Sequence, residues 1–235
     1  MLTLLTFPGH GRFPSLSPFC LKAMCLLEMS GQVWVPSYVS DPSKMPCGRL
    51  PVLRTSEALI PDSDAIQAWL QTRGAGFDAG LDRAETAHAH ALVTMAEEGL
   101  RHGLAHDRWL RADCWPATRK AFFGALPAPV RGPVAAHARR QIRRMLELQG
   151  TALFSESARL GRMGRDLDAV RATLGEKPYL FGDGPGTADA AIVPVLDMIR
   201  DLPCETGLRE MVRGDANLVA WIDRTAAAVY PSFPS

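Results

Sequence analysis

Four residues near the N-terminus, Ser17-Pro18-Phe19-Cys20, have the types and spacing of a thiol site at the start of a helix. A thiol-redox protein would carry Cys-Pro-aromatic-Cys there, so an oxygen stands where the first sulfur would be. Ser17 can cap the helix by accepting a hydrogen bond from a free amide of the first turn, with Pro18 at the first helical position. The same amides and the positive end of the helix dipole can stabilise a thiolate. These residues alone leave both interpretations open.

Two further segments have features that favour ligand binding. Gly48-Arg49-Leu50-Pro51-Val52-Leu53 places a proline inside a strand-like run, where it cannot donate to a sheet ladder. A cis Leu50–Pro51 bond that turns the Leu50 backbone toward a ligand would explain it, and a trans proline on an edge strand is the alternative. Ten residues later, Asp62 or Ser63 can cap a second helix, whose free amides suit a carboxylate.

The elements that must position these residues fall into two groups. Up to about residue 73, short apolar runs alternate with turn signals and predict a small α/β layer in the order β-α-β-β-β-α. Its expected strands are 2–7, 33–39, 50–54 and 58–60, with 33–39 at an edge because of Pro36. Its expected helices are 17–29 and 62–72.

Beyond a glycine-rich linker at 74–80, the spacing of apolar residues is helical to the end of the chain. A helix of about thirty residues is predicted over 82–111 and would form the spine of a bundle. The segment 126–133, LPAPVRGP, predicts a loop because of its three prolines. Further helices are expected near 116–123, 134–149, 163–174, 187–202 and 216–229.

Composition favours a soluble globular protein over a membrane-spanning or nucleic-acid-binding one. The 235 residues are 47% hydrophobic and 22% charged, which is ordinary for a soluble globular chain, and a net charge of +1 gives no field that would recruit nucleic acid. No run of apolar residues is long enough for a membrane span or a signal peptide. Five scattered cysteines suit reduced thiols better than a disulfide framework. A cytoplasmic protein without nucleic-acid partners is therefore expected.

The three N-terminal motifs, S-P-F-C, G-R-L-P-V-L and D-S-D-A-I-x-x-W-L, together resemble the thioredoxin-like N-terminal domain of glutathione transferases. The stretch 174–190, LGEKPYLFGDGPGTADA, resembles the loop and capped helix at the core of the family's helical domain. Glu97–Leu100 with Arg108-Trp109, and the stretch 122–127, resemble metaxin-like and failed-axon-connections-like members. The resemblance implies an α/β thioredoxin-like N-terminal domain at residues 1–73 and an all-α C-terminal domain at 81–230.

The same resemblance implies roles for individual residues. Ser17 would be the catalytic residue that activates the sulfur of glutathione. Leu50, which precedes Pro51, would pair its backbone with the cysteinyl unit. Asp62 and Ser63 would hold the γ-glutamyl end. Arg49 is assigned to the glycyl carboxylate on charge alone.

The activity implied is attack of the glutathione thiolate on a small electrophile, in a homodimer, with glutathione as co-substrate and no metal. The electrophile would bind between the α/β layer and the long helix, near Met95, Gly99, His102 and Trp109. One alternative is a binding or interaction module that keeps the fold without turnover. Another is a glutathione-dependent thiol oxidoreductase using Cys20, although a cysteine inside the helix is expected to face the core.

Several weaker signals have ordinary structural explanations. Glu98, His102 and His106 share a helix face that could hold a metal, but a solvated or pocket-lining face is favoured because no fourth ligand is apparent. Gly99 and Gly103 indicate a close helix crossing.

The basic stripe of Arg139, Arg140, Arg143 and Arg144 suits a solvated face or a subunit contact. At the start of the helix at 187, Gly186 replaces the usual Ser or Thr cap, and Asp189 is expected to return a bond to its backbone.

Overall fold

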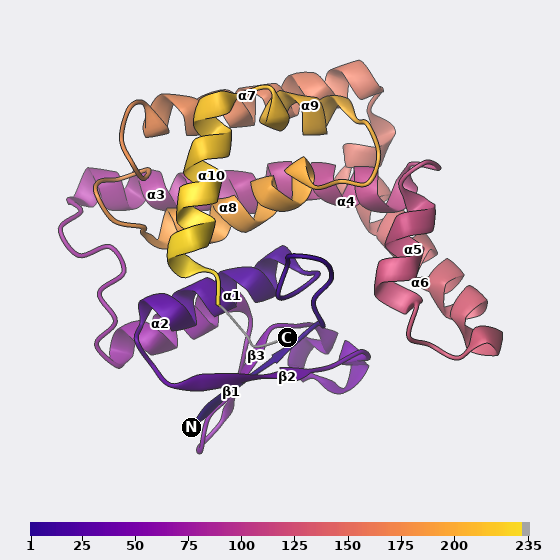
Figure 1. The fold of residues 1–235 in the computed structure, drawn as a ribbon, viewed down its shortest axis with the longest axis horizontal. Coiled ribbons are helices and arrows are strands. Elements are labelled where there is room, and N and C mark those ends of the chain that lie inside the picture. The colour runs from indigo at the N-terminus through magenta and orange to yellow at the C-terminus, as the bar shows by residue number, and fades with distance from the viewer. Residues whose placement is uncertain (232–235) are drawn as a thin grey trace. The chain divides into compact units, whose positions relative to one another are not determined.

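The computed structural model describes residues 1–231 and contains a four-stranded mixed sheet near the N-terminus (Figure 1). The strands β1 (Leu2–Thr6), β2 (Trp34–Tyr38), β3 (Val52–Arg54) and β4 (Leu59–Pro61) lie in the order β2-β1-β3-β4. β1 pairs with β2 in parallel and with β3 antiparallel, and β3 pairs with β4 antiparallel. Pro36 stands in β2, which is an edge strand as predicted from its missing N–H.

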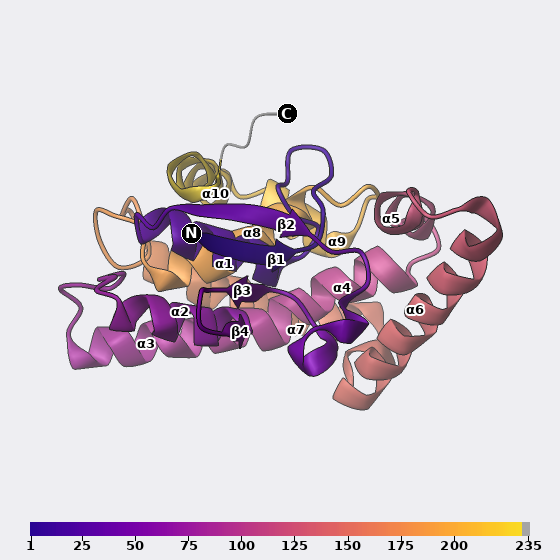
Figure 2. The ribbon, with the colours of Figure 1, turned by 90° about the horizontal axis from the view of Figure 1, so that it is seen from below.

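Helices α1 (Pro18–Met29) and α2 (Ser63–Thr72) cover one face of this sheet (Figures 1 and 2). α1 is buried without interruption from Cys20 to Leu27, so its apolar composition reflects a central position. α2 turns Ile66 and Leu70 into the same core. The short helices η1 (Pro42–Lys44) and η2 (Pro46–Gly48) connect β2 to β3.

Beyond α2, the regular elements of the described residues are helices, which confirms the prediction of an α/β N-terminal part followed by an all-α part. The predicted long helix is a continuous run, but it contains a π-helical turn, η3, that the spacing did not predict. The run comprises α3 (Arg83–Met95), η3 (Ala96–Leu100) and α4 (Arg101–Leu110). The later elements are α5 (Trp115–Phe123), α6 (Ala128–Gln149), η4 (Thr151–Leu153), α7 (Glu156–Leu174), α8 (Thr187–Arg200), α9 (Gly207–Arg213) and α10 (Ala216–Val229).

The loop predicted at 126–133 is wrong beyond its first two residues, because α6 begins at Ala128 and runs through Pro133. Pro127 is the N-cap residue and Pro129 lies in the first turn, where a missing N–H removes no helical hydrogen bond. Only Pro133 interrupts the ladder, and the helix continues past it.

In space the chain divides into two compact units. Unit 1 comprises Met1–His90, Glu176–Pro194 and the described residues from Trp221 to 231, and unit 2 comprises Ala91–Gly175 and Val195–Ala220. The domain boundaries 1–73 and 81–230 implied by the family resemblance stay a prediction. No helix in residues 1–231 combines the length and the apolar character needed to cross a membrane.

Asp189 is buried in unit 1, where its side chain forms hydrogen bonds to three other residues. Its carboxylate accepts hydrogen bonds from the Leu180 amide (3.1 Å), the Gly186 amide (2.9 Å) and Trp221 Nε1 (2.8 Å). The bond to Gly186 is the one predicted for the helix start. Burial nevertheless raises the pKa of Asp189, because three N–H donors only partly replace water.

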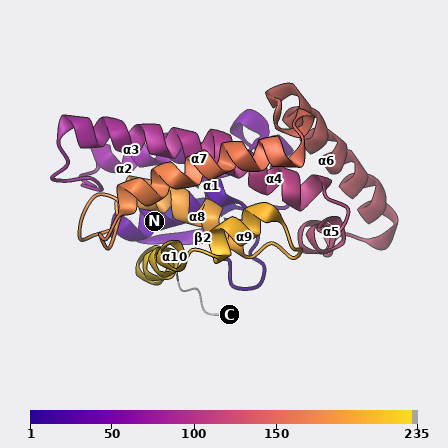
Figure 3. The same cartoon turned by 90° about the horizontal axis from the view of Figure 1, so that it is seen from above.

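In unit 2, the structure contradicts the prediction of reduced cysteines and confirms the predicted close approach at two glycines. Cys114 and Cys204 form a disulfide, so the prediction of five reduced thiols is wrong for this pair, which lies 90 residues apart in sequence. The close approach predicted at the glycines is confirmed. A β-carbon at Gly99 would collide with Asp166, and one at Gly103 with Met163 of α7 and Leu208. Figure 3 shows α7 running alongside the helix that contains these glycines.

Candidate functional site

Ser17 is the N-cap residue of α1, as predicted. Its backbone is extended (φ −105°, ψ 127°), and its Oγ accepts a hydrogen bond from the Cys20 amide at 3.4 Å. Pro18 occupies the first helical position. The Ser17 side chain is half-buried, so its hydroxyl stands at the N-terminus of α1 within reach of solvent.

Two buried hydroxyl groups form a hydrogen-bonded chain that ends at the backbone of Ser17. Thr6 Oγ1, at the end of β1, donates to Ser15 Oγ at 3.2 Å, and Ser15 Oγ accepts from the Ser17 amide at 3.4 Å. The start of α1 is thereby tied to the sheet. Neither residue was predicted from sequence, and the only signal was a second serine two positions before Ser17.

The Cys20 thiol is fully buried beside these hydroxyls, as expected for a core-facing cysteine. It packs against Leu5, Leu50 and Val52. Burial raises the pKa of Cys20, although hydrogen bonds from the neighbouring hydroxyls and the Phe7 backbone offset part of the effect. The thiolate of Cys20 is therefore disfavoured near neutral pH.

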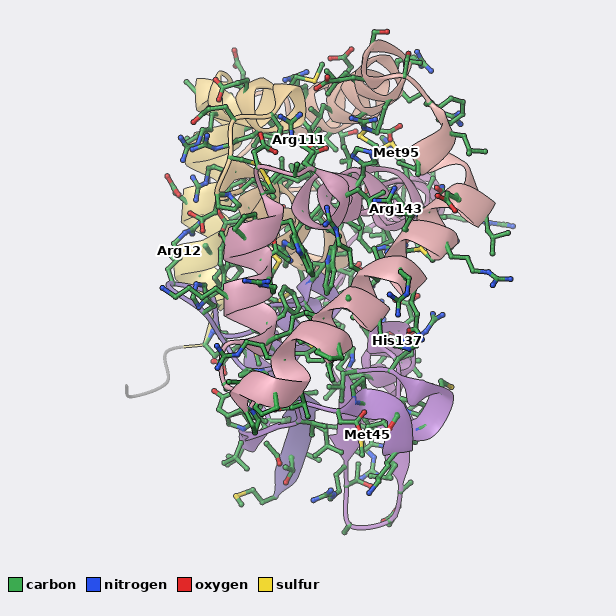
Figure 4. All side chains as sticks on the ribbon, turned by 90° about the vertical axis from the view of Figure 1, so that its right-hand side faces the viewer. Arg12, Met45, Met95, Arg111, His137 and Arg143 are labelled. Atoms are coloured by element: carbon green, nitrogen blue, oxygen red, sulfur yellow. A yellow bond between two sulfur atoms is a disulfide. The ribbon has the colours of Figure 1, made fainter. Side chains whose placement is uncertain are left out.

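The Leu50–Pro51 peptide bond is cis, which was one of the two alternatives for this proline. Leu50 is buried, and its backbone N–H and C=O have no hydrogen-bond partner within residues 1–231. The Pro51 carbonyl accepts from the Asp62 amide at 3.1 Å. Met45, labelled in Figure 4, packs against the cluster that contains Leu50.

Asp62 and Ser63 begin α2. Asp62 is the N-cap residue, and its Oδ1 accepts from the Asp64 amide at 2.8 Å. Its φ of 76° lies in a region that non-glycine residues seldom adopt, and such strain persists only where the surroundings fix it. Ser63 is almost fully buried, and its hydroxyl makes no hydrogen bond within the described chain.

A buried lysine joins the two helices of this site. Lys22 on α1 is 1% exposed, and its Nζ lies 2.5 Å from Oδ1 of Asp64 in the first turn of α2. The pair fixes the N-terminus of α2 to α1. Lys22 was not predicted either, and its one sequence signal is a lone charge in the apolar run Phe19–Leu27.

Five of the six predicted site residues thus belong to one connected set within unit 1. Ser17 binds Cys20, Cys20 packs on Leu50, and Pro51 binds Asp62, which precedes Ser63. Arg49 is exposed, and no hydrogen bond or ion pair within residues 1–231 joins it to the others.

The residues expected to face the electrophile lie in unit 2 but do not share one site. Met95 and Gly99 line a hollow of about 420 Å³ that also includes Asp166 of α7. Burial raises the pKa of Asp166. Trp109 instead packs in an aromatic cluster, with Phe122 at 5.0 Å between ring centroids.

Both ring nitrogens of His102 form hydrogen bonds to residues of the same helical run. Its Nδ1 donates to the Glu98 carbonyl at 2.6 Å, which leaves Nε2 to accept from Arg101 at 2.5 Å. Burial lowers the pKa of His102, in keeping with a neutral ring. His106 bonds Asp107 instead (3.0 Å). The one potential metal-ligand group in the part of the chain described here contains the disulfide cysteines.

Comparison with known proteins agrees with this architecture. Residues 18–114 match the glutathione S-transferase N-terminal domain, and residues 163–225 match the glutathione S-transferase C-terminal domain. The chain belongs to the glutathione S-transferase family. Its fold is a thioredoxin-like α/β domain followed by a helical domain.

Among its relatives, Metaxin-1 of Macaca fascicularis and of Mus musculus are each 26% identical over 98% of this chain and 75% of their own length. The isoprene-epoxide–glutathione S-transferase of Rhodococcus sp. (strain AD45) is 26% identical over 95% of this chain and 97% of its own length. The predicted metaxin-like resemblance is confirmed by these similarities.

Solved structures share the fold. Glutathione transferase GSTFuA3 from Phanerochaete chrysosporium aligns with a TM-score of 0.68 at 17% identity, covering 99% of this chain and 98% of that one. The β-etherase LigF from Sphingobium sp. strain SYK-6 aligns with a TM-score of 0.64 at 17% identity, covering 97% and 96%.

Proposed function

We propose that this chain binds glutathione in unit 1 and transfers it, as the thiolate, to a small electrophile. The observation that supports this most directly is the connected set of Ser17, Leu50, Asp62 and Ser63, in which the backbone of Leu50 and the hydroxyl of Ser63 have no hydrogen-bond partner among residues 1–231. A tripeptide with a central thiol and a terminal amino-acid group suits such a set.

Each group has a chemical task in this proposal. The Leu50 N–H and C=O pair with the backbone of the cysteinyl unit. The Ser63 hydroxyl and the first amides of α2 bind the α-carboxylate of the γ-glutamyl end, and the Asp62 carboxylate attracts its ammonium group. Arg49, an exposed residue with a long side chain, neutralises the glycyl carboxylate.

Ser17 lowers the pKa of the glutathione thiol. Its cap bond to Cys20 uses an oxygen lone pair, and its O–H, which also reaches the buried Cys20 thiol, would have to turn to the sulfur of glutathione when the tripeptide binds. A free thiol titrates near pKa ~8.5, and one charge-assisted hydrogen bond plus a helix N-terminus lower that pKa by about one to two. The proton leaves to solvent, sulfur attacks the electrophilic carbon, and the bond to the leaving oxygen or other leaving group breaks.

The electrophile class to test first is an epoxide, because the Rhodococcus relative is named for one. Formation of a homodimer and a cytoplasmic location are further parts of this proposal. Light scattering of the purified protein tests the former.

A non-catalytic binding module is the second candidate, and the similarity to Metaxin-1 over 98% of the chain favours it. A thiol oxidoreductase that uses Cys20 is the third, and the burial and raised pKa of Cys20 count against it.

Thermal melts with and without millimolar reduced glutathione test binding. At ~100 times its dissociation constant, glutathione adds ~2.7 kcal/mol of stability, which raises the Tm by roughly 5–10 °C for a chain of this size. Ser63→Ala should remove this shift, whereas Ser56→Ala, an exposed serine in the β3–β4 turn, should keep it. No shift in the wild type would reject glutathione binding and favour the interaction module.

A further inference from the structure

One face of α6 carries arginines where a packed helix normally carries apolar side chains. Gly132, Ala135 and Ala136 are followed on the same face by Arg139, Arg140 and Arg143, at spacings of three and four residues. These six residues line a hollow of about 280 Å³ within unit 2. The small residues leave room above the helix, and the arginines supply the charge. Figure 4 looks onto α6 and labels Arg143.

Helix α5 forms the other wall of this hollow through Trp115 and Arg119. Four arginines and no acidic residue therefore line the hollow. Arg119, Arg140 and Arg143 are exposed, and no carboxylate of residues 1–231 forms an ion pair with them.

Arg139 is held in place at the base of the group. Its Nε and Nη2 donate to the carbonyls of Trp109 (2.8 Å) and Leu110 (3.1 Å) at the C-terminus of α4. Its guanidinium also lies 4.7 Å above the ring of Trp115. Burial and the charge of Arg143 lower the pKa of Arg139, which is the effect expected where positive charges crowd. The hollow is thus a concave, cationic site with one wall already fixed.

We propose that this hollow binds a small molecule that carries a phosphate or diphosphate group. Planar guanidinium groups bind phosphate oxygens in pairs, and three exposed arginines call for a ligand with more than one negative charge. A hollow of this volume suits one compact anionic group, whereas a stable protein partner would need an interface of roughly 800 Å² on each side. The site is separate from the glutathione proposal and does not depend on it.

Calorimetric titration with inorganic pyrophosphate at low ionic strength tests the proposal. The double variant Arg140→Gln, Arg143→Gln should bind pyrophosphate at least ten-fold more weakly than the wild type. The control is Arg144→Gln, which removes one positive charge from the adjacent exposed position of α6 outside the hollow, and Arg143→Gln is the single variant that matches it in charge. The Arg144→Gln control should keep its affinity within about two-fold. Circular dichroism melts verify that each variant is folded, and Arg119→Gln replaces the double variant if that one is not.

Four results would overturn the proposal. The wild type fails to bind pyrophosphate, all variants bind it equally, or Arg144→Gln weakens binding as much as the double variant. A fourth is a single-stranded oligonucleotide binding the wild type at least ten-fold more tightly than pyrophosphate, which would assign the arginines to nucleic acid instead.

Discussion

At the scale of single residues, the Ser17 hydroxyl has two separable effects. As a cap it stabilises α1, and as a hydrogen-bond donor it would lower the pKa of a bound thiol. Ser17→Ala should therefore reduce the free energy of unfolding by ~1 kcal/mol and move the pH profile of glutathione transfer upward by about one to two pH units. At a fixed pH below the thiol pKa, the rate should fall about ten-fold for each pH unit that the profile moves, because less thiolate is present. Stopped-flow rates with an epoxide between pH ~5.5 and ~9 measure the profile.

Ser155→Ala is the matched control, since Ser155 caps α7 by accepting from the Ala158 amide at 3.2 Å. It should cost similar stability and leave the pH profile unchanged. An unaltered profile in Ser17→Ala would make Ser17 a cap only and remove it from the proposed chemistry.

At the scale of elements, the spacing of apolar residues predicted most helices, because most helices bury one continuous stripe of apolar side chains. The errors occur where the local signal and the packed structure differ. Pro127 and Pro129 are typical of a loop but occupy the start of α6, where proline is tolerated. The helix α9 has only seven residues and is too short for its pattern to stand out.

The candidate site was predictable only in part, because some of its residues carry a local sequence signal and others are defined by their contacts in the folded chain. Ser17, Pro51 and Asp62 carry local signals: a cap before a proline, a proline in a strand, and an acidic residue before a helix. Thr6 and Ser15 act through a hydrogen bond to each other across nine positions, and Lys22 acts through its pair with Asp64, 42 positions away. The signals in their immediate sequence, a second serine and a lone charge in an apolar run, do not identify the partners in those contacts.

Two helical glycines allow the packing of α4 to be tested against helix propensity alone. Gly103 lies where a β-carbon would meet Met163 and Leu208, whereas Gly161 on α7 faces open space. Gly103→Ala should lower the free energy of unfolding by about 1–3 kcal/mol because the crossing is overpacked. Gly161→Ala should raise it by about 0.5–1 kcal/mol, since alanine is the better helix former. Urea unfolding of both variants gives the two values, and equal effects in both would contradict the close crossing.

At the scale of the whole molecule, the disulfide joins positions that are far apart in the sequence. Cys114 lies between α4 and α5, and Cys204 precedes α9. Near Cys114, Arg111 (labelled in Figure 4) pairs with Asp113 at 2.8 Å and with Glu156 of α7 at 3.3 Å, so ionic contacts hold this corner as well. The corner therefore depends on long-range covalent and electrostatic links.

Cysteine labelling and melting together test this link and the burial of the other thiols. At pH ~8, iodoacetamide should modify only Cys47 in the folded protein, because Cys47 is exposed while burial raises the pKa of Cys20 and of Cys25. Unfolding without reductant should expose three thiols, and reduction should expose all five, as counted by intact mass. For a separation of 90 residues, loop-closure entropy predicts that reduction costs roughly 4–5 kcal/mol and lowers the Tm by roughly 8–20 °C. Five reactive thiols in the unfolded, unreduced protein would show instead that Cys114 and Cys204 are neighbours without a bond, and the Tm would then be insensitive to reductant.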